Sequence, residues 1–350
     1  MSLGALLGLA LSLKLIGTLD LPKDLTVDGA PLGGVSGVDY DRRTGDWLMI
    51  SDDRSDKAPA RFFVGRLDYD AHGVKGLRLT GQVPLRQPDG STFAGSRSPS
   101  GERVDAEALR IDPRTSELVW TSEGDAARGF DPSLRRMNRA GAWRGTISTP
   151  PAFRFDPAKA EGARPNQTFE GVSFSPGGRW LWLAMEAPLV EDGAVSTVAQ
   201  GGVTRITRLD RSGRVMAQYA YRLDPVQAAA LHRGDNGVSE ILAVDDRRLL
   251  VLERSGVEGE PGRFAFHCRL YLVDLATGQD IAGRRSLLGA TPRTLAKRLL
   301  VNFDHVPGGA VNLEAMTWGR ELGGKRTLVL LADDNFATDQ AQRVLVFGVR

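Results

Sequence analysis

Five segments of this chain repeat one pattern, and this repetition restricts the fold more than any other feature of the sequence. Each segment begins with a polar residue, usually Glu, and continues as a short apolar run. A turn rich in Asp, Pro, Gly and Arg follows, and then a second apolar run that ends at an acidic residue. Two apolar runs on either side of turn residues predict a β-hairpin. The five hairpins are Val35–Asp53, Ala106–Gly124, Phe169–Ala187, Ser239–Arg254 and Leu313–Asp334.

Two more strands are expected after each of the first four hairpins. The third strands are Phe62–Asp68, Leu134–Arg139, Thr204–Asp210 and Leu270–Asp274. The fourth strands are more polar and alternate better, as outer strands do; they are Leu77–Leu85, Trp143–Thr149, Val215–Leu223 and Ile281–Leu288. A helix is expected at Thr294–Leu300.

The fifth repeat ends one strand short. Its third strand is Val344–Val349, and Lys14–Leu21, which resembles Val215–Leu223, is expected to supply the fourth. Four-stranded antiparallel units completed in this way predict an all-β fold, a five-bladed β-propeller closed by an N-terminal strand. A sixth blade within Arg284–Val306 is the structural alternative, and residues 1–350 are interpreted as one propeller domain.

Composition excludes several classes of protein. A net charge of +2 gives no bulk field for nucleic acid or an anionic membrane. A lone Cys268 and four scattered histidines exclude an intramolecular disulfide and the usual zinc sites. The apolar run Leu3–Leu13 is too short to span a bilayer. Residues 1–13 are interpreted as the remnant of a secretory signal or an added segment, or as a plain first strand or helix.

Acidic residues recur at both ends of the predicted hairpins. Glu107, Glu170, Glu240 and Glu314 begin first strands, with Ser36 in their place in the first repeat, and Asp52, Glu123, Glu186, Glu253 and Asp333 end second strands. Positions paired across a hairpin lie about 4.5–5.5 Å apart. Because first strands line the central channel of a propeller, nine carboxylates are expected to meet at one mouth of that channel.

Like charges gathered in this way require a bound cation, nearby arginines or protonation. Oxygen ligands without His or Cys favour Ca²⁺. The candidate ligands are Glu107, Glu170, Glu186, Glu240, Glu314 and Asp333, with Glu170 and Glu240 first. Arginines available to neutralise the acids are Arg54, Arg97, Arg103 and Arg254. Candidate substrate-binding residues are Arg54, Arg103, Asn166, Asn236 and Asn312.

Three stretches of the chain resemble the phytase-like family of bacterial proteins with esterase-like activity. They are DAEAL at 105–109, FEGVSFSPGGRWLWLAMEAP at 169–188, and NLEAMTW at 312–318 with TLVLLADDNF at 327–336. The resemblance extends from about Val35 to Phe347, although Ala108 and Ala315 stand where the family usually has Gly. It implies a fold related to the calcium-dependent β-propeller phytases, hydrolysis of esters, and a periplasmic or secreted location. The positions that match the family are Glu107, Glu170, Glu186, Glu240, Glu314, Asp333 and Asp334.

The sequence therefore predicts a calcium-dependent hydrolase of a small phosphate or carboxylic ester, with no nucleic-acid partner and no membrane span. The catalytic base is not assigned, and the G-x-S-x-G motif of a serine hydrolase is absent. Two alternatives stay open. One is a non-catalytic propeller that binds a ligand or a protein and holds a structural metal, and the other is a lactonase-like propeller.

Overall fold

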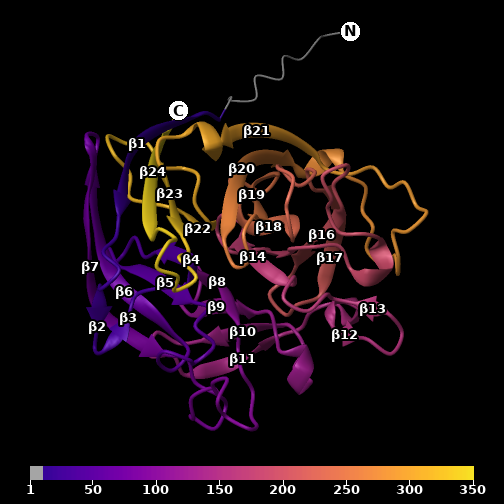
Figure 1. Ribbon diagram of the computed structural model, residues 1–350, viewed down its shortest axis with the longest axis horizontal. Coiled ribbons are helices and arrows are strands. Elements are labelled where there is room, and N and C mark those ends of the chain that lie inside the picture. Colours follow the sequence, from indigo (N-terminus) through magenta and orange to yellow (C-terminus); the bar gives the residue numbers. More distant parts are fainter. Residues whose placement is uncertain (1–10) are drawn as a thin grey trace.

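A computed structural model describes residues 11–350, which form a five-bladed β-propeller (Figure 1). Each blade is a four-stranded antiparallel sheet. From the channel outward, blade 1 contains β4 (Val35–Tyr40), β5 (Trp47–Ser51), β6 (Arg61–Asp70) and β7 (Gly73–Pro84), and blade 2 contains β8 (Ala106–Ile111), β9 (Leu118–Ser122), β10 (Ser133–Met137) and β11 (Trp143–Ile147). This architecture confirms the predicted fold class.

The remaining three blades follow the same order. Blade 3 contains β14 (Phe169–Phe174), β15 (Leu181–Met185), β16 (Val203–Leu209) and β17 (Val215–Arg222), and blade 4 contains β18 (Gly234–Ala243), β19 (Arg248–Glu258), β20 (Phe264–Asp274) and β21 (Ala296–Asn302). Blade 5 contains β22 (Leu313–Trp318), β23 (Thr327–Ala332), β24 (Arg343–Val349) and β1 (Leu13–Asp20).

The first strands of the blades surround the channel (Figure 1). Strand β4 lies between β8 and β22, and β18 lies between β14 and β22, so the ring is continuous. Because each blade repeats one strand order, all five first strands run in the same direction. Their starts therefore gather at one mouth of the channel and their ends at the other.

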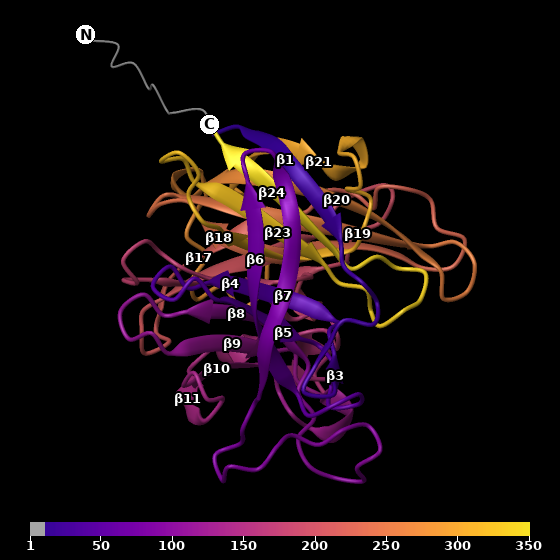
Figure 2. The same ribbon diagram turned by 90° about the vertical axis from the view of Figure 1, so that its left-hand side faces the viewer.

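The N-terminal strand closes the ring, as predicted from the missing strand of the fifth repeat. Strand β1 pairs antiparallel with β24, from Leu13 opposite Val349 to Asp20 opposite Arg343. It also contacts β7 of blade 1, and Figure 2 shows the two strands meeting on the side of the ring that faces the viewer. The predicted signal remnant lies mostly in residues 1–10, outside the described residues.

Blade 4 departs from the prediction in its outer strand. The segment 281–288 is not that strand, because Ile281 and Leu287 are buried against Ala220 of blade 3. The outer strand is β21, which overlaps the predicted helix Thr294–Leu300. That prediction is wrong because these residues form a ladder with β20. The alternative of a sixth blade in Arg284–Val306 is also wrong, since the segment completes blade 4.

Apolar clusters hold the blades together. Within the described chain, each interface between neighbouring blades has its own cluster of buried side chains. Second strands such as β15 and β19 contribute to clusters on both of their faces, which explains their nearly continuous apolar sequences. Burying this apolar surface is the main stabilising contribution to the ring.

Short elements lie in the loops between the strands. They are the two-residue strands β2 (Thr26–Val27), β3 (Ala30–Pro31), β12 (Phe155–Asp156) and β13 (Glu161–Gly162), and the 3₁₀ turns η1 (Ala126–Arg128), η2 (Pro151–Phe153), η3 (Val190–Asp192), η4 (Leu275–Thr277) and η5 (Phe303–His305). No helix in residues 11–350 has the length and apolar character needed to cross a membrane.

Candidate metal and ester site

Every first strand contains a β-bulge. The pairing with the second strand shifts between Val35 and Gly37, and equivalent shifts occur at the start of β8, β14 and β22 and inside β18, between Val238 and Glu240. A bulge inserts an extra residue and redirects its side chain. The residues in the bulges are Ser36, Glu107, Glu170, Ser239 and Glu314; the bulge of blade 2 also includes Ala108.

A second set of side chains comes from the residue that follows the second strand. In four blades this residue is acidic, and its backbone N–H donates to a carbonyl just before the first strand of the same blade. Asp52 donates to Gly34 at 2.9 Å, and Glu186 donates to Thr168 at 2.7 Å. Glu123 and Asp333 make the same bond to Asp105 and Asn312. The repeated bond places each acid beside the bulge residue of its blade.

Blade 4 differs from the other blades by one residue of register. Val238 pairs with Glu253, so the bulge residue is Ser239 and the residue after this pair is Arg254. The expectation that Glu240 and Glu253 join the other acids is therefore wrong. Glu240 forms a salt bridge with Arg110 at 2.6 Å, and Glu253 forms one with Lys297 at 2.5 Å.

Buried carboxylates gather at the mouth where the first strands start. We define the carboxylate ring as Asp52, Asp105, Glu107, Glu123, Glu170, Glu186, Glu314 and Asp333; Asp52 is half-buried and the other seven are buried. Oxygens of Asp105, Glu107 and Glu123 lie within 4.8 Å of one another, and so do oxygens of Glu123, Glu170 and Glu186. Glu123 is shared by both groups.

Burial and mutual repulsion change the acidity of the ring. Desolvation, followed by the charge of Glu170, raises the pKa of Glu107 well above its usual range. Desolvation and the charge of Glu186 act in the same direction on the pKa of Glu170. Desolvation raises the pKa of Glu186 to about 7, although Arg254 opposes the change. The ring therefore holds more negative charge than its surroundings stabilise.

Two arginines of the described chain form salt bridges with the ring. Arg254 lies 3.0 Å from Glu186 and 3.0 Å from Glu314. Arg54 forms a salt bridge with Asp105, and its side chain is 36% exposed, so it reaches solvent at the mouth. Within the described chain, Asp52, Glu107, Glu123, Glu170 and Asp333 form no salt bridge with either arginine.

The residues present fit a hard cation. In the described chain, the Asp52 Oδ1, Asp105 Oδ1 and Ser36 Oγ atoms are buried and have no hydrogen-bond partner. An unpaired buried oxygen is costly unless an ion or water satisfies it. The two groups that share Glu123 supply only carboxylate oxygens, which is the ligand chemistry of Ca²⁺ rather than of zinc.

The predicted ligands and substrate-binding residues lie in different places. Of the predicted ligands, Glu107, Glu170, Glu186, Glu314 and Asp333 lie in the carboxylate ring, whereas Glu240 does not. Asn312 donates to Glu314 at 3.1 Å, and Asn166 accepts from Arg54 at 2.5 Å, so both contact the ring or its arginine. Asn236 instead donates to Glu253 at 2.9 Å, and Arg103 pairs with Asp125. Arg97 is exposed.

Arg110 was not singled out from the sequence, and it closes the channel. Its guanidinium donates to the carbonyls of Val38, Ile241 and Met316, which belong to three other first strands, and pairs with Glu240. Desolvation raises the pKa of Glu240 to about 8. A charged residue inside the apolar run AEALRI was the available signal, because a buried arginine needs a partner. The carboxylate ring is thereby separated from the other mouth.

The chain was compared with known proteins and solved structures. No curated protein matches the sequence significantly. Similar solved structures include the Dos1 propeller (7% identity, 91% of this chain and 69% of that chain, TM-score 0.36) and the tail fiber of a Staphylococcus aureus phage (11%, 97% and 52%, 0.40). A putative oxidoreductase (glucose dehydrogenase) from Thermus thermophilus is also similar (14%, 91% and 85%, 0.35).

The sequence profile described as "Phytase-like: Esterase-like activity of phytase" matches residues 30–336, which include all five first strands and the whole carboxylate ring. The chain therefore belongs to the phytase-like family.

Proposed function

We propose that the protein is a calcium-dependent hydrolase of small phosphate or carboxylic esters, and that the carboxylate ring is its active site. Family membership supports ester hydrolysis as the reaction class. The observation that carries the proposal is the surplus of buried carboxylates, which two arginines leave largely uncompensated. A divalent cation would remove that surplus.

The ion would be held on the side of the ring away from Arg254. There Asp105, Glu107 and Glu123 offer carboxylate oxygens within 4.8 Å of one another, and an oxygen of Glu170 lies within 4.8 Å of Glu123. Glu186 and Glu314 share Arg254, so they are less available as ligands. When bound, Ca²⁺ would polarise the ester oxygen and lower the pKa of a coordinated water.

The side chains of the ring divide the remaining tasks. Arg54 is the more exposed of the two arginines and would hold the anionic end of a substrate at the mouth. Glu186, whose pKa is raised to about 7, is suited to accept a proton near neutral pH. The channel is closed behind the ring by Arg110 and Glu240, so substrate would enter and product leave through the same mouth.

Hydrolysis assays with and without chelator test the proposal. We expect turnover of p-nitrophenyl phosphate or p-nitrophenyl butyrate with Ca²⁺, and a loss of about 100-fold or more with EDTA or in Glu123→Gln. Glu260→Gln is the matched control, because Glu260 is exposed and pairs only with the exposed Arg263. If a lactone alone is cleaved, the protein is a lactonase. If nothing is cleaved while Ca²⁺ raises the melting temperature, the metal is structural and the protein is a binding propeller.

We also propose a periplasmic or secreted location. Calcium modules outside the cell work with dissociation constants of about 10⁻⁴–10⁻³ M, and a site of that affinity would be occupied there but not in the cytosol. Detecting the protein in fractionated cells tests this proposal, and a purely cytosolic pool would contradict it.

A further inference from the structure

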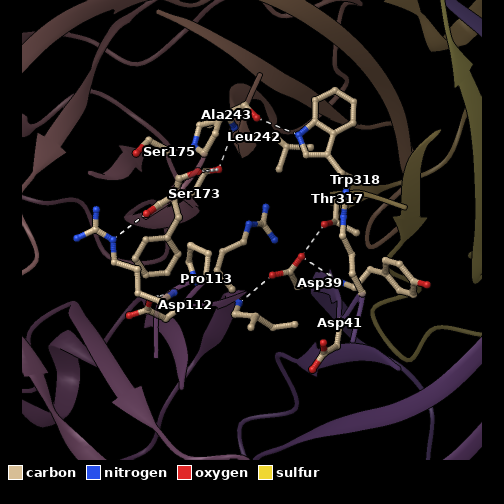
Figure 3. Close-up of a pocket in the computed structure, with 18 of the residues that line it drawn as sticks. Asp39, Asp41, Asp112, Pro113, Ser173, Ser175, Leu242, Ala243, Thr317 and Trp318 are labelled. Carbon is tan, nitrogen blue, oxygen red and sulfur yellow. Dashed lines mark hydrogen bonds between the residues drawn. The ribbon is translucent and has the colours of Figure 1, made fainter. Parts of the chain in front are cut away.

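A cavity of about 680 Å³ opens at the mouth opposite the carboxylate ring (Figure 3). Each of the five first strands contributes a side chain near its end. These are Asp39, Arg110, Ser173, Leu242 and Thr317. We call this cavity the distal pocket. Its volume lies in the range of sites that enclose a small molecule, about 300–1,000 Å³.

We propose that the distal pocket is a second ligand site, which binds a small organic anion with a flat apolar body. The site is independent of the proposed hydrolase, because the salt bridge between Arg110 and Glu240 lies between the pocket and the carboxylate ring. First strands of about six residues separate the two mouths by roughly 20 Å.

The walls of the pocket favour a flat apolar body. Ile111, Phe174, Leu242 and Val244 line it together with Trp318. The indole of Trp318 is fixed, because its Nε1 donates to the carbonyl of Ala243 at 2.9 Å, as Figure 3 shows. A fixed aromatic face binds a second flat ring with little loss of conformational freedom.

The acidic groups in the pocket already have partners. Asp41 forms a salt bridge with Arg139 at 2.6 Å, and Asp112 forms one with Arg211. Asp39 accepts from Thr317 at 2.7 Å and from the backbone N–H of Ile111 at 2.8 Å (Figure 3). Because their oxygens already accept these bonds, the three carboxylates are poor ligands for a cation, in contrast to those of the carboxylate ring.

Donors, by contrast, are left over in the pocket. The guanidinium of Arg326 lies over the ring of Trp318, 4.3 Å from its centroid, and makes no salt bridge in the described chain. Burial, followed by the positive charges of Arg42 and Arg248, lowers the pKa of Arg326, and the negative charges of Asp245 and Glu321 oppose this change.

Together these features specify the ligand class. The apolar walls and Trp318 select a flat body, and Arg326 stands beside that aromatic face. An anionic head placed against Arg326 would make charge-assisted hydrogen bonds, while the body stacks on Trp318. A neutral molecule of the same shape would gain the stacking alone.

Calorimetric titration with a matched pair of probes tests this proposal. Naphthalene-2-sulfonate is the anion, and naphthalene-2-sulfonamide is the neutral molecule of similar shape; neither has an ester bond. We expect the wild-type protein to bind the sulfonate at least about tenfold more tightly than the sulfonamide. Arg326→Gln should remove that preference, whereas Arg263→Gln, at an exposed arginine of another loop, should retain it.

The location of binding is checked by two further measurements. EDTA should leave sulfonate binding unchanged, because no predicted metal ligand lines the pocket. Trp318→Leu, with its melting temperature measured to verify folding, should weaken both probes. The proposal would be overturned if the protein did not bind the sulfonate at about 1 mM or bound both probes with equal affinity. It would also be overturned if Arg326→Gln kept the preference for the sulfonate, or if EDTA abolished binding. A failure of ester hydrolysis would not affect any of these results.

Discussion

Buried carboxylates occur in two different arrangements in this propeller. Asp53 pairs with Arg61 at 2.5 Å, Asp192 pairs with Arg205 at 2.6 Å, and Glu240 pairs with Arg110 at 2.6 Å, with all partners nearly inaccessible to solvent. Each of these acids has an arginine of its own. In the carboxylate ring, only three of the eight acids form salt bridges within the described chain: Asp105 with Arg54, and Glu186 and Glu314 with Arg254.

This difference is not caused by a shortage of arginine, since the chain has 45 Lys and Arg residues. The paired acids are tolerated in the interior because each charge is compensated within the protein, and removing one partner is destabilising. The negative charge of the carboxylate ring is not neutralised within the protein, and we propose that a bound cation neutralises it. The same residue type therefore has opposite effects on stability in the two places, and this contrast can be measured.

The largest effect is expected from breaking a paired acid. Arg205 donates to both oxygens of Asp192, at 2.6 and 2.7 Å. Arg205→Met would leave a buried, uncompensated carboxylate and should lower the free energy of unfolding by about 3–5 kcal/mol. Urea denaturation measures this loss. The double change Arg205→Met with Asp192→Leu should recover part of it, and no recovery would show that packing rather than charge is responsible.

Adding calcium should have the next largest effect, and the effect should depend on pH. Glu186 has a pKa of about 7 in the folded protein against 4.5 as its ordinary value, so the folded state holds more protons between these pH values. The metal-free protein should therefore lose stability as pH rises through this window. Ca²⁺ competes with these protons, so its stabilisation, about 2.7 kcal/mol at 100 times the dissociation constant, should be larger at about pH 8 than at about pH 5.5.

Melting curves in EDTA and in CaCl₂ at the two pH values check this prediction. Mg²⁺ is a useful comparison ion, because it requires a smaller octahedral site and should stabilise less. A calcium effect that is equal at both pH values would show that the ion does not bind at groups with raised pKa values.

Removing one charge from the ring should stabilise the metal-free protein. Glu123 belongs to both oxygen groups of the ring, and burial and the charge of Asp105 raise its pKa well above the usual range. Glu123→Gln keeps an oxygen that accepts from the backbone N–H of Thr168. In EDTA at about pH 8, it should raise the free energy of unfolding by about 1–2 kcal/mol. In CaCl₂ the same substitution should lower the free energy of unfolding, because it removes a ligand of the ion. If it lowered the free energy of unfolding in both buffers, the ring acids would stabilise the protein in the same way as the paired acids.

The smallest effect is expected at an exposed pair. Arg247 contacts Asp274 through two nitrogens, but its side chain is 56% exposed. Arg247→Gln should leave the urea midpoint within experimental error, because solvent screens such pairs. A clear loss of stability there would mean that surface pairs also contribute to the fold.

Most of the fold was predictable because the order of apolar runs, turn residues and acidic residues repeats along the sequence. Alternation and turn chemistry identified the hairpins, and the missing last strand pointed to Lys14–Leu21. The outer strand of blade 4 was not predictable in the same way. Ile281–Leu288 is as apolar as a strand, but its apolar residues are buried against blade 3 instead.

The sequence predicted that carboxylates gather at one mouth of the channel, but it did not identify all of the residues that do so. The spacing of the repeats predicts that Glu107 and Glu170 belong to the ring, and they lie there because each is the bulge residue of its own first strand. In blade 4 the bulge residue is Ser239, one residue before Glu240. Ser239 and Arg254 therefore occupy the positions at the mouth that the sequence pattern assigned to Glu240 and Glu253. A one-residue shift moves side chains to the other face of a strand, and a single sequence does not show it. Asp105 and Arg110 were missed as site residues because they do not recur among the repeats.

The pairing of β1 with β24 has a consequence for biosynthesis. Strand β24 leaves the ribosome after every other strand of the ring, so β1 waits without its partner while the first four blades are made. An unpaired strand edge is a template for association with other chains. The nascent protein therefore exposes an unpaired β1 until β24 has been made, and a chaperone that covers β1 would act in that interval.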